Sequence, residues 1–170
     1  QDPIALDFAT EVLLSQRQEL GQMARMLAER DVNRPDFDPD RSAMGWMGMS
    51  VTAATMPGMA SDADLERLRT TAGLEADELF LTLMQAHHEG GIHMAEDAAG
   101  NAEDAAVREL AARIARIQAS EVAEYQILLD ELEFRRTGVE APDQHQRHGE
   151  CDQRRPQRDP ARVAFFGFAL

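Results

Sequence analysis

Two long helix-forming stretches, separated by only a short break, constrain the fold of this chain more than any other feature. The first runs from Glu75 to about Ala99 and is followed by Gly100, and the second covers residues 102–136, with Asn101 as its expected cap. Asn is a good N-terminal cap, and Gly favours the conformation in which helices often end. Two long helices joined by so short a turn form a helical hairpin.

Two further helices are expected before the hairpin. In residues 3–31 apolar residues recur at helical spacing, and Pro3 suits a first helical position. Ser61 and Asp64 form a capping-box pattern that predicts a short helix over residues 61–72. Because the first helix must pack across the hairpin to bury its apolar side, the sequence predicts an all-α, up-and-down helical bundle.

The remaining segments lack long helical patterns. Residues 32–60 contain several Pro and Gly and are expected to form a long connection with at most short helical turns. From residue 135 the apolar periodicity is lost, so residues 135–170 are predicted to be a poorly ordered tail that need not belong to the native domain. The expected organisation is one domain, residues 3–134, followed by this tail.

Composition excludes several classes of partner. The 170 residues include 17 Arg, no Lys and 31 acidic residues, giving a net charge of −14, which disfavours binding to nucleic acids and anionic membranes. No apolar run approaches the roughly 20 residues of a membrane span. Cys151 is the single cysteine, so an internal disulfide is excluded. The chain begins at Gln1 rather than Met, and we expect its N-terminus to have been trimmed.

A polar stripe is predicted inside the bundle. At 100° per residue, one side of helix 75–99 faces the core and the opposite side, with Glu89 and His93, faces solvent. The core-facing side carries Met84, His87, His88, Gly91 and Met94. The expected inner faces of the other helices carry Gln118, Glu121 and Tyr125 on the last helix and Gln16 and Glu19 on the first.

Two interpretations of the histidine pair remain open. His87 and His88 could hydrogen-bond Glu121, Gln118 or Gln16 and fix the packing register. Alternatively, they could bind a soft or borderline metal with the thioethers of Met84 and Met94, and copper(I) is the natural candidate. Glu121 and Gln118 would then support the ligands. Gly90 and Gly91 would leave space beside the imidazoles for a neighbouring helix or an ion.

Methionine usage favours a soft metal, although methionine is also an adaptable filler of irregular cores. Five of the nine methionines fall within residues 44–59 and could form an accessory metal site: Met44, Met47, Met49, Met56 and Met59. In the tail, His145, His148 and Cys151 could bind zinc or nickel adventitiously.

Known catalytic patterns are absent from the sequence. His88, Glu89 and His93 have one residue too many for a zincin helix, which excludes a metalloprotease of that type. The paired Glu-x-x-His motifs of di-iron bundles are also missing. We therefore expect a protein that is not an enzyme.

The sequence resembles a bacterial ferritin-like family known as domain of unknown function three hundred and five. The resemblance covers about residues 4–134 and rests on three features: the helix with Phe80, His87, His88, Gly91, Met94 and Ala95, the segment Met56–Met59 with the short helix after it, and the step from Gln118 to Glu121. Many members repeat the His-His helix near the N-terminus. Here only Asp7, Phe8, Met23 and Ala24 persist, and the histidine positions hold Ser15, Gln16 or Arg17.

The resemblance implies a helical bundle, export to the periplasm or the exterior and, in some members, copper binding. The expected function is therefore an exported metal-binding protein that binds, buffers or transports copper(I). The alternative is a structural or interaction module whose histidine pair is hydrogen-bonded and whose acidic surface meets a partner or a second copy.

Overall fold

The protein is all-α apart from one very short hairpin. The computed structural model describes residues 3–32, 36 and 38–138. Its elements, in chain order, are α1 (Pro3–Ala28), β1 (Ser42–Ala43), η1 (Gly45–Met47), β2 (Val51–Thr52), η2 (Ala53–Thr55), α2 (Asp62–Thr70), α3 (Leu74–Asn101) and α4 (Ala105–Thr137). The four predicted helices are thus confirmed. The tail prediction falls mostly on residues 139–170, which lie outside the described residues, and residues 135–137 complete α4.

The chain divides into two units, which are described separately. One unit contains α1, and the other contains β1 to α4. In α1 the most buried residues, Ala5, Val12 and Glu19, recur every seven positions and share one face. The packing of α1 across the hairpin, and with it a single domain of residues 3–134, stays a prediction.

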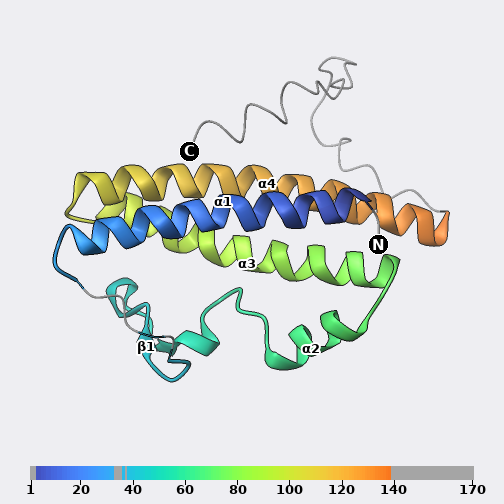
Figure 1. Ribbon diagram of the computed structural model, residues 1–170, viewed down its shortest axis with the longest axis horizontal. Helices are drawn as coiled ribbons and strands as arrows, with labels where there is room; N and C mark the ends of the chain where they lie inside the picture. Colours follow the sequence, from blue (N-terminus) through green and yellow to red (C-terminus); the bar gives the residue numbers. More distant parts are fainter. Residues whose placement is uncertain (1–2, 33–35, 37, 139–170) are drawn as a thin grey trace, which may run out of the picture. The chain divides into compact units, whose positions relative to one another are not determined.

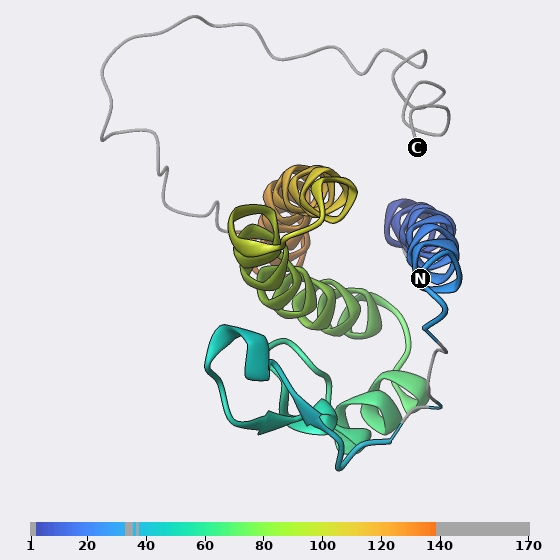
Figure 2. The same ribbon diagram turned by 90° about the vertical axis from the view of Figure 1, so that its left-hand side faces the viewer.

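The second unit is built on the hairpin of α3 and α4, which run antiparallel along their length (Figure 1). Its core includes Leu79 and Leu81 from α3 and Leu110, Leu128 and Leu132 from α4, all at most 9% exposed. Figure 2 shows the connection of residues 38–61 on the side of α3 that faces away from α4. α3 therefore lies between α4 and the methionine-rich connection.

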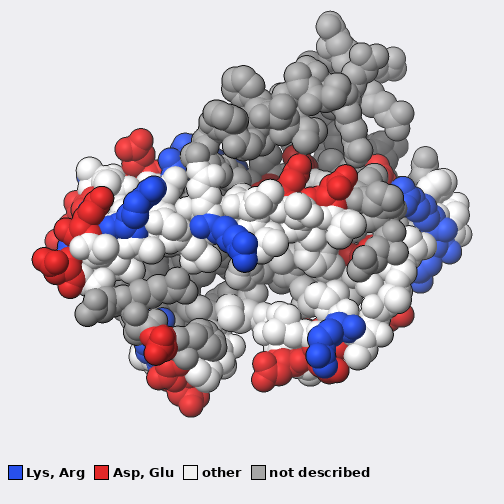
Figure 3. Space-filling view, viewed as in Figure 1, with Lys and Arg blue, Asp and Glu red and all other residues white. Residues whose placement is uncertain are grey.

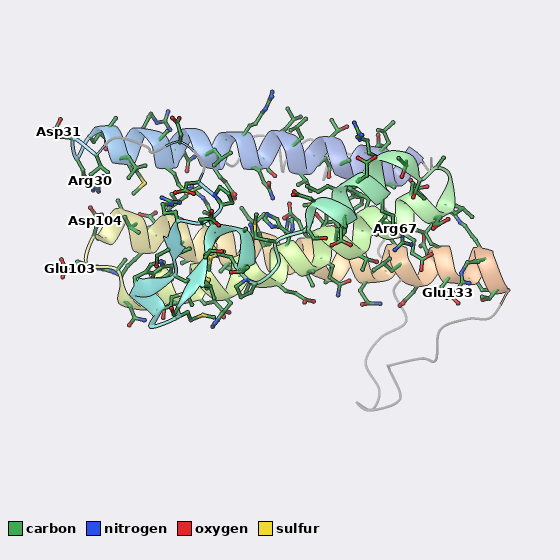
Figure 4. All side chains as sticks on the ribbon, turned by 90° about the horizontal axis from the view of Figure 1, so that it is seen from below. Arg30, Asp31, Arg67, Glu103, Asp104 and Glu133 are labelled. Carbon is green, nitrogen blue, oxygen red and sulfur yellow. The ribbon has the colours of Figure 1, made fainter. Side chains whose placement is uncertain are left out.

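The turn of the hairpin differs from the predicted one. Asn101 does not cap the last helix, because it still belongs to α3 and its side chain donates to Asp97. The cap is Asp104, whose Oδ1 accepts from the backbone N–H groups of Ala106 (2.8 Å) and Val107 (3.3 Å). Figure 4 shows Asp104 and Glu103 together at this turn, at the other end of the hairpin from Glu133.

The connection contains two features that the sequence did not reveal. β1 and β2 pair antiparallel with Ser42 opposite Thr52 and Ala43 opposite Val51, and Met44 adopts a left-handed conformation (φ 58°) between them. Met44 is also 3% exposed, so this methionine packs in the interior. After η2, the predicted capping box of Ser61 and Asp64 is present and starts α2.

α2 is a polar helix joined to α3 by an ion pair. It has no buried residue, and both signs of charge cover it in Figure 3. Arg67 lies 3.3 Å from Glu75 at the start of α3. The two hydrogen bonds from Ser61 lower the pKa of Asp64 and so keep its carboxylate ionised at the N-terminus of α2.

We expect Asp104→Ala to lower the free energy of unfolding by about 1 kcal/mol, because two N–H groups at the start of α4 lose their acceptor. Asp104→Asn should retain most of the stability, since Asn is an equally good cap. Urea denaturation of the two variants beside the wild-type chain measures the difference. Equal loss in both variants would show that the charge of Asp104, rather than its capping, is what matters.

Candidate functional site

His88 is the most buried polar residue of the hairpin, at 1% exposed. Its Nδ1 lies 2.9 Å from the backbone carbonyl of Met84, one turn earlier in α3. Its Nε2 lies 2.8 Å from Oε2 of Glu121 on α4. Tyr125, one turn after Glu121, is fully buried and packs edge-on against the imidazole with ring centroids 5.2 Å apart. The predicted proximity of this histidine to Glu121 is thus observed.

The hydrogen bonds of His88 fix its protonation pattern. A carbonyl oxygen only accepts, so Nδ1 carries a proton and donates it to Met84. One further proton is then shared between Nε2 and Glu121, as an imidazolium with a carboxylate or an imidazole with a carboxylic acid. In both cases neither ring nitrogen has a free lone pair. His88 could bind a metal only if Nε2 left Glu121.

His87 lies in a different environment. It is half-buried, and its ring meets that of His88 edge-on at 6.0 Å between centroids. Burial, and then the neighbouring charge of His88, lower the pKa of His87, while a hydrogen bond to the backbone of Gly58 opposes this shift. At neutral pH His87 is therefore a neutral imidazole. If one ring nitrogen donates to Gly58, the other keeps its lone pair.

Neighbouring groups pack closely against Gly90 and Gly91, the two glycines that follow the histidine pair. A Cβ at Gly91 would lie 2.3 Å from Oε1 of Gln118, and a Cβ at Gly90 would lie 2.2 Å from the carbonyl oxygen of Pro57. The space predicted beside the imidazoles is thus filled by a side chain of α4 and by the backbone of the connection. Gln118 is 8% exposed, and its Oε1 has no hydrogen-bond donor among the residues that the structure describes.

The turn at residues 56–59 packs directly on α3. The N–H of Met59 donates to the carbonyl of Met56 (3.1 Å), and Gly58 has a φ of 82°. A type II turn favours Pro at its second position and Gly at its third, as in Met56–Met59. A Cβ at Gly58 would lie 2.5 Å from the carbonyl oxygen of Ala86 and 3.0 Å from Cα of His87. Backbone therefore meets backbone at this contact, and sequence reasoning did not detect it.

The other predicted site residues are dispersed. Met84 and Met94 are half-buried on α3, as are Met47, Met49 and Met56 in the connection, whereas Met59 is 39% exposed. His93 is exposed, as predicted. His145, His148 and Cys151 lie outside the described residues. Pairing of Gln16 with the histidines would join the two units and stays a prediction.

Two kinds of feature are absent from the described residues. Within residues 3–32, 36 and 38–138, no group of three His, Cys, Asp or Glu residues is placed to hold a metal ion. None of the described helices is both long and apolar enough to cross a membrane.

Comparison with known proteins gives one family. The model of the family DUF305, a domain of unknown function, matches residues 1–129. The solved "putative secreted protein DUF305" from Streptomyces coelicolor is 30% identical, with a TM-score of 0.68 over 84% of this chain and 80% of that one. A DUF305 fragment from Deinococcus radiodurans is 27% identical, with a TM-score of 0.64 over 77% of this chain and 78% of that one. No curated protein matches the chain.

We expect Glu121→Ala to lower the free energy of unfolding by about 1–3 kcal/mol, because Nε2 of the buried His88 loses its partner. Glu131→Ala, an exposed substitution in the same helix, should change it by less than about 0.5 kcal/mol. Urea denaturation near neutral pH measures both. Equal effects of the two substitutions would contradict a stabilising role for the His88–Glu121 pair.

His87 should make stability fall at acidic pH. Because its folded-state pKa is below the ordinary value of 6.5, the unfolded chain takes up a proton first as the pH falls through that value. The loss of stability ends once the pH is below the lowered pKa of folded His87. His87→Gln should reduce the fall, as measured by the melting temperature at pH values between about 7.5 and 4.5. An unchanged pH profile in this variant would rule out His87 as its source.

Proposed function

Because the chain belongs to the DUF305 family, whose model matches residues 1–129, and because it holds a neutral imidazole beside methionines, we propose that it binds copper(I). The observation that carries this proposal is the environment of His87. Metal-binding histidines commonly donate their other N–H to a backbone carbonyl, and the hydrogen bond to Gly58 has this form.

The choice of metal follows from the available ligands. The described residues offer no third carboxylate, thiolate or imidazole, so a site of the kind that zinc prefers is not supported. The thioether of Met84 is one turn from His87 on α3, and soft thioethers suit copper(I). His87 would supply the nitrogen ligand, with Met84 and Met94 as sulfur ligands. A bound copper ion would accept electron pairs from these ligands. We assign the chain a role in holding the ion rather than in a reaction.

His88 has a different part in this proposal. Its two nitrogens are engaged, so we assign it first to positioning α3 against α4, with Glu121 as its partner and Gln118 beside it. As a primary ligand, His88 would have to exchange Glu121 for the metal. That exchange is the one route by which both histidines could bind the same ion.

Export to the periplasm or the exterior is part of the same proposal. The relative from Streptomyces coelicolor carries the name "putative secreted protein DUF305". Methionine thioethers bind copper(I) without a thiolate, which suits an oxidising compartment. A protein of this kind would buffer or carry the ion outside the cytoplasm.

A second candidate function is supported by the His88–Glu121 pair. A buried pair that joins two helices is a sufficient structural reason for the presence of His88. The chain would then be a structural or interaction module, and its net charge of −14 would suit a cationic partner. If the chain is such a structural or interaction module, its affinity for metal should not depend on His87.

A competition titration with a copper(I)-specific chelator under anaerobic conditions tests the proposal. The full chain with His145→Ala, His148→Ala and Cys151→Ser is the reference, so that tail residues cannot bind the ion. We expect one-to-one binding that His87→Ala weakens at least about tenfold, because the nitrogen ligand is lost. His93→Ala, on the exposed side of the same helix, should leave the affinity within about twofold. Equal affinities in these two variants would contradict the proposal and favour the structural function.

A further inference from the structure

The turn at Met56–Met59 and the His87 segment of α3 form one local structure. Pro57 and Gly58, at the tip of the turn, contact α3 at Ala86, His87 and Gly90. Met56 and Met59 are the residues on either side of this tip, and their Cα atoms lie close together because a hydrogen bond closes the turn. Met56 and Met59 therefore lie beside this contact although they precede the histidine pair by about thirty residues in the sequence.

Two glycines make this contact. Gly90 lies one turn after His87 on the same face of α3, and a Cβ there would overlap the carbonyl oxygen of Pro57 at 2.2 Å. Gly58 has both a positive φ and no room for a Cβ. Because the atoms that would clash belong to backbone, no side-chain rotation could relieve either overlap.

We propose that Met56 and Met59 complete the metal site of His87, and that Gly90 is the positioning residue that lets their turn rest on α3. The inference rests on the proposed function. It replaces two separate sites, one on α3 and one in the connection, by a single site built across their contact. A Cβ at Gly58 would lie 3.0 Å from Cα of His87, so the middle of the turn rests on the residue that carries the ring.

The chemistry of the two segments is complementary for copper(I). α3 contributes the half-buried imidazole of His87, and the turn contributes two thioethers on unbranched side chains with three rotatable bonds each. Met59 is 39% exposed, so an ion could reach its sulfur from solvent. Met44, by contrast, is 3% exposed and is better explained by packing.

The structure also suggests why the turn would be needed. His88, the neighbour of His87, has both nitrogens engaged by Met84 and Glu121. His87 must then find further ligands outside the pair. A Cβ at Gly58 would lie 3.0 Å from Cα of His87, so the methionines on either side of this turn are candidates from another element.

The affinity test uses the full chain with the three tail substitutions. We expect Met56→Leu together with Met59→Leu to weaken copper(I) binding at least about tenfold, since Leu keeps the apolar volume and removes the sulfur. The matched control is Met47→Leu with Met49→Leu, two half-buried methionines elsewhere in the connection, which should stay within about twofold. Equal affinities in the two double variants would overturn the inference.

Gly90→Ala tests the positioning role. The added Cβ must push Pro57 away from α3, so the affinity should fall about as far as in the Met56/Met59 variant. The metal-free chain offers a second readout, because the ring-nitrogen NMR shifts of His87 should change when the hydrogen bond to Gly58 is lost. Gly100→Ala, at a position with nothing within 4 Å, is the control. An unchanged His87 spectrum and affinity in Gly90→Ala would contradict the role of Gly90.

Methyl-labelled methionine gives a test without substitution. Adding silver(I), a diamagnetic substitute for copper(I), should shift the methyl signals of Met56 and Met59 and leave those of Met47 and Met49 in place. If His87→Ala abolishes binding but the turn methyls do not respond, the copper proposal stands and this inference fails. If His87→Ala has no effect, the proposed function fails and this inference fails with it.

Discussion

The buried bond between His88 and Glu121 determines the register of the hairpin. An imidazole that is 1% exposed must have partners for both nitrogens, and here one partner is its own helix and the other is α4. Sliding α3 along α4 by one turn would leave Nε2 of the buried His88 without its partner, which costs about 1–3 kcal/mol. Packing of leucines alone tolerates such shifts more easily, because many registers bury similar apolar area. The polar pair therefore sets which residues lie opposite each other.

With that register fixed, the two glycines determine how closely other groups approach α3. Gly91 faces α4 and receives Gln118, while Gly90 faces the connection and receives Pro57. Two adjacent helical residues point about 100° apart, so consecutive glycines open two neighbouring sides of one helix. Each glycine costs about 1 kcal/mol of helix propensity relative to Ala. The glycines allow close contacts on both sides of α3. The contact at Gly90 places His87 against a turn that carries methionines.

The sequence predicted the helices well because their signals are local. Ser61 with Asp64, the apolar spacing of residues 75–99 and Gly138 after α4 act within a few residues, and the structure follows them closely. Gly100, which was expected to end the first long helix, lies inside α3 instead, because that helix continues through Asn101. The cap of α4 was misassigned because Asn101 and Asp104 are both good caps three residues apart, and only the length of α3 decides between them. The pairing of His88 with Glu121 was also foreseeable, since helical geometry places both residues on inner faces.

The contact between Gly58 and His87 could not be foreseen in the same way. It joins residues about thirty positions apart through backbone atoms, and no periodicity reports on such a contact. The sequence offered only an indirect signal, namely glycines at Gly58 and Gly90 where other residues would serve the local structure as well or better. Helix propensity disfavours Gly90, and a type II turn explains Gly58 without any neighbour. Only together do they indicate a close approach of two segments.

This distinction bears on the choice between a structural and a metal-binding function. If His88 and Glu121 served packing alone, His87 would have no reason to be half-buried, because burial of a neutral imidazole beside a second histidine lowers its pKa and destabilises the fold at acidic pH. A glutamine or leucine at residue 87 would avoid that cost. Retaining an unprotonated imidazole there has a physical advantage for a chain that uses its lone pair. Under the proposed function, the methionines across the contact, rather than the net charge of −14, would account for selectivity, since carboxylates attract every cation while thioethers favour soft ones.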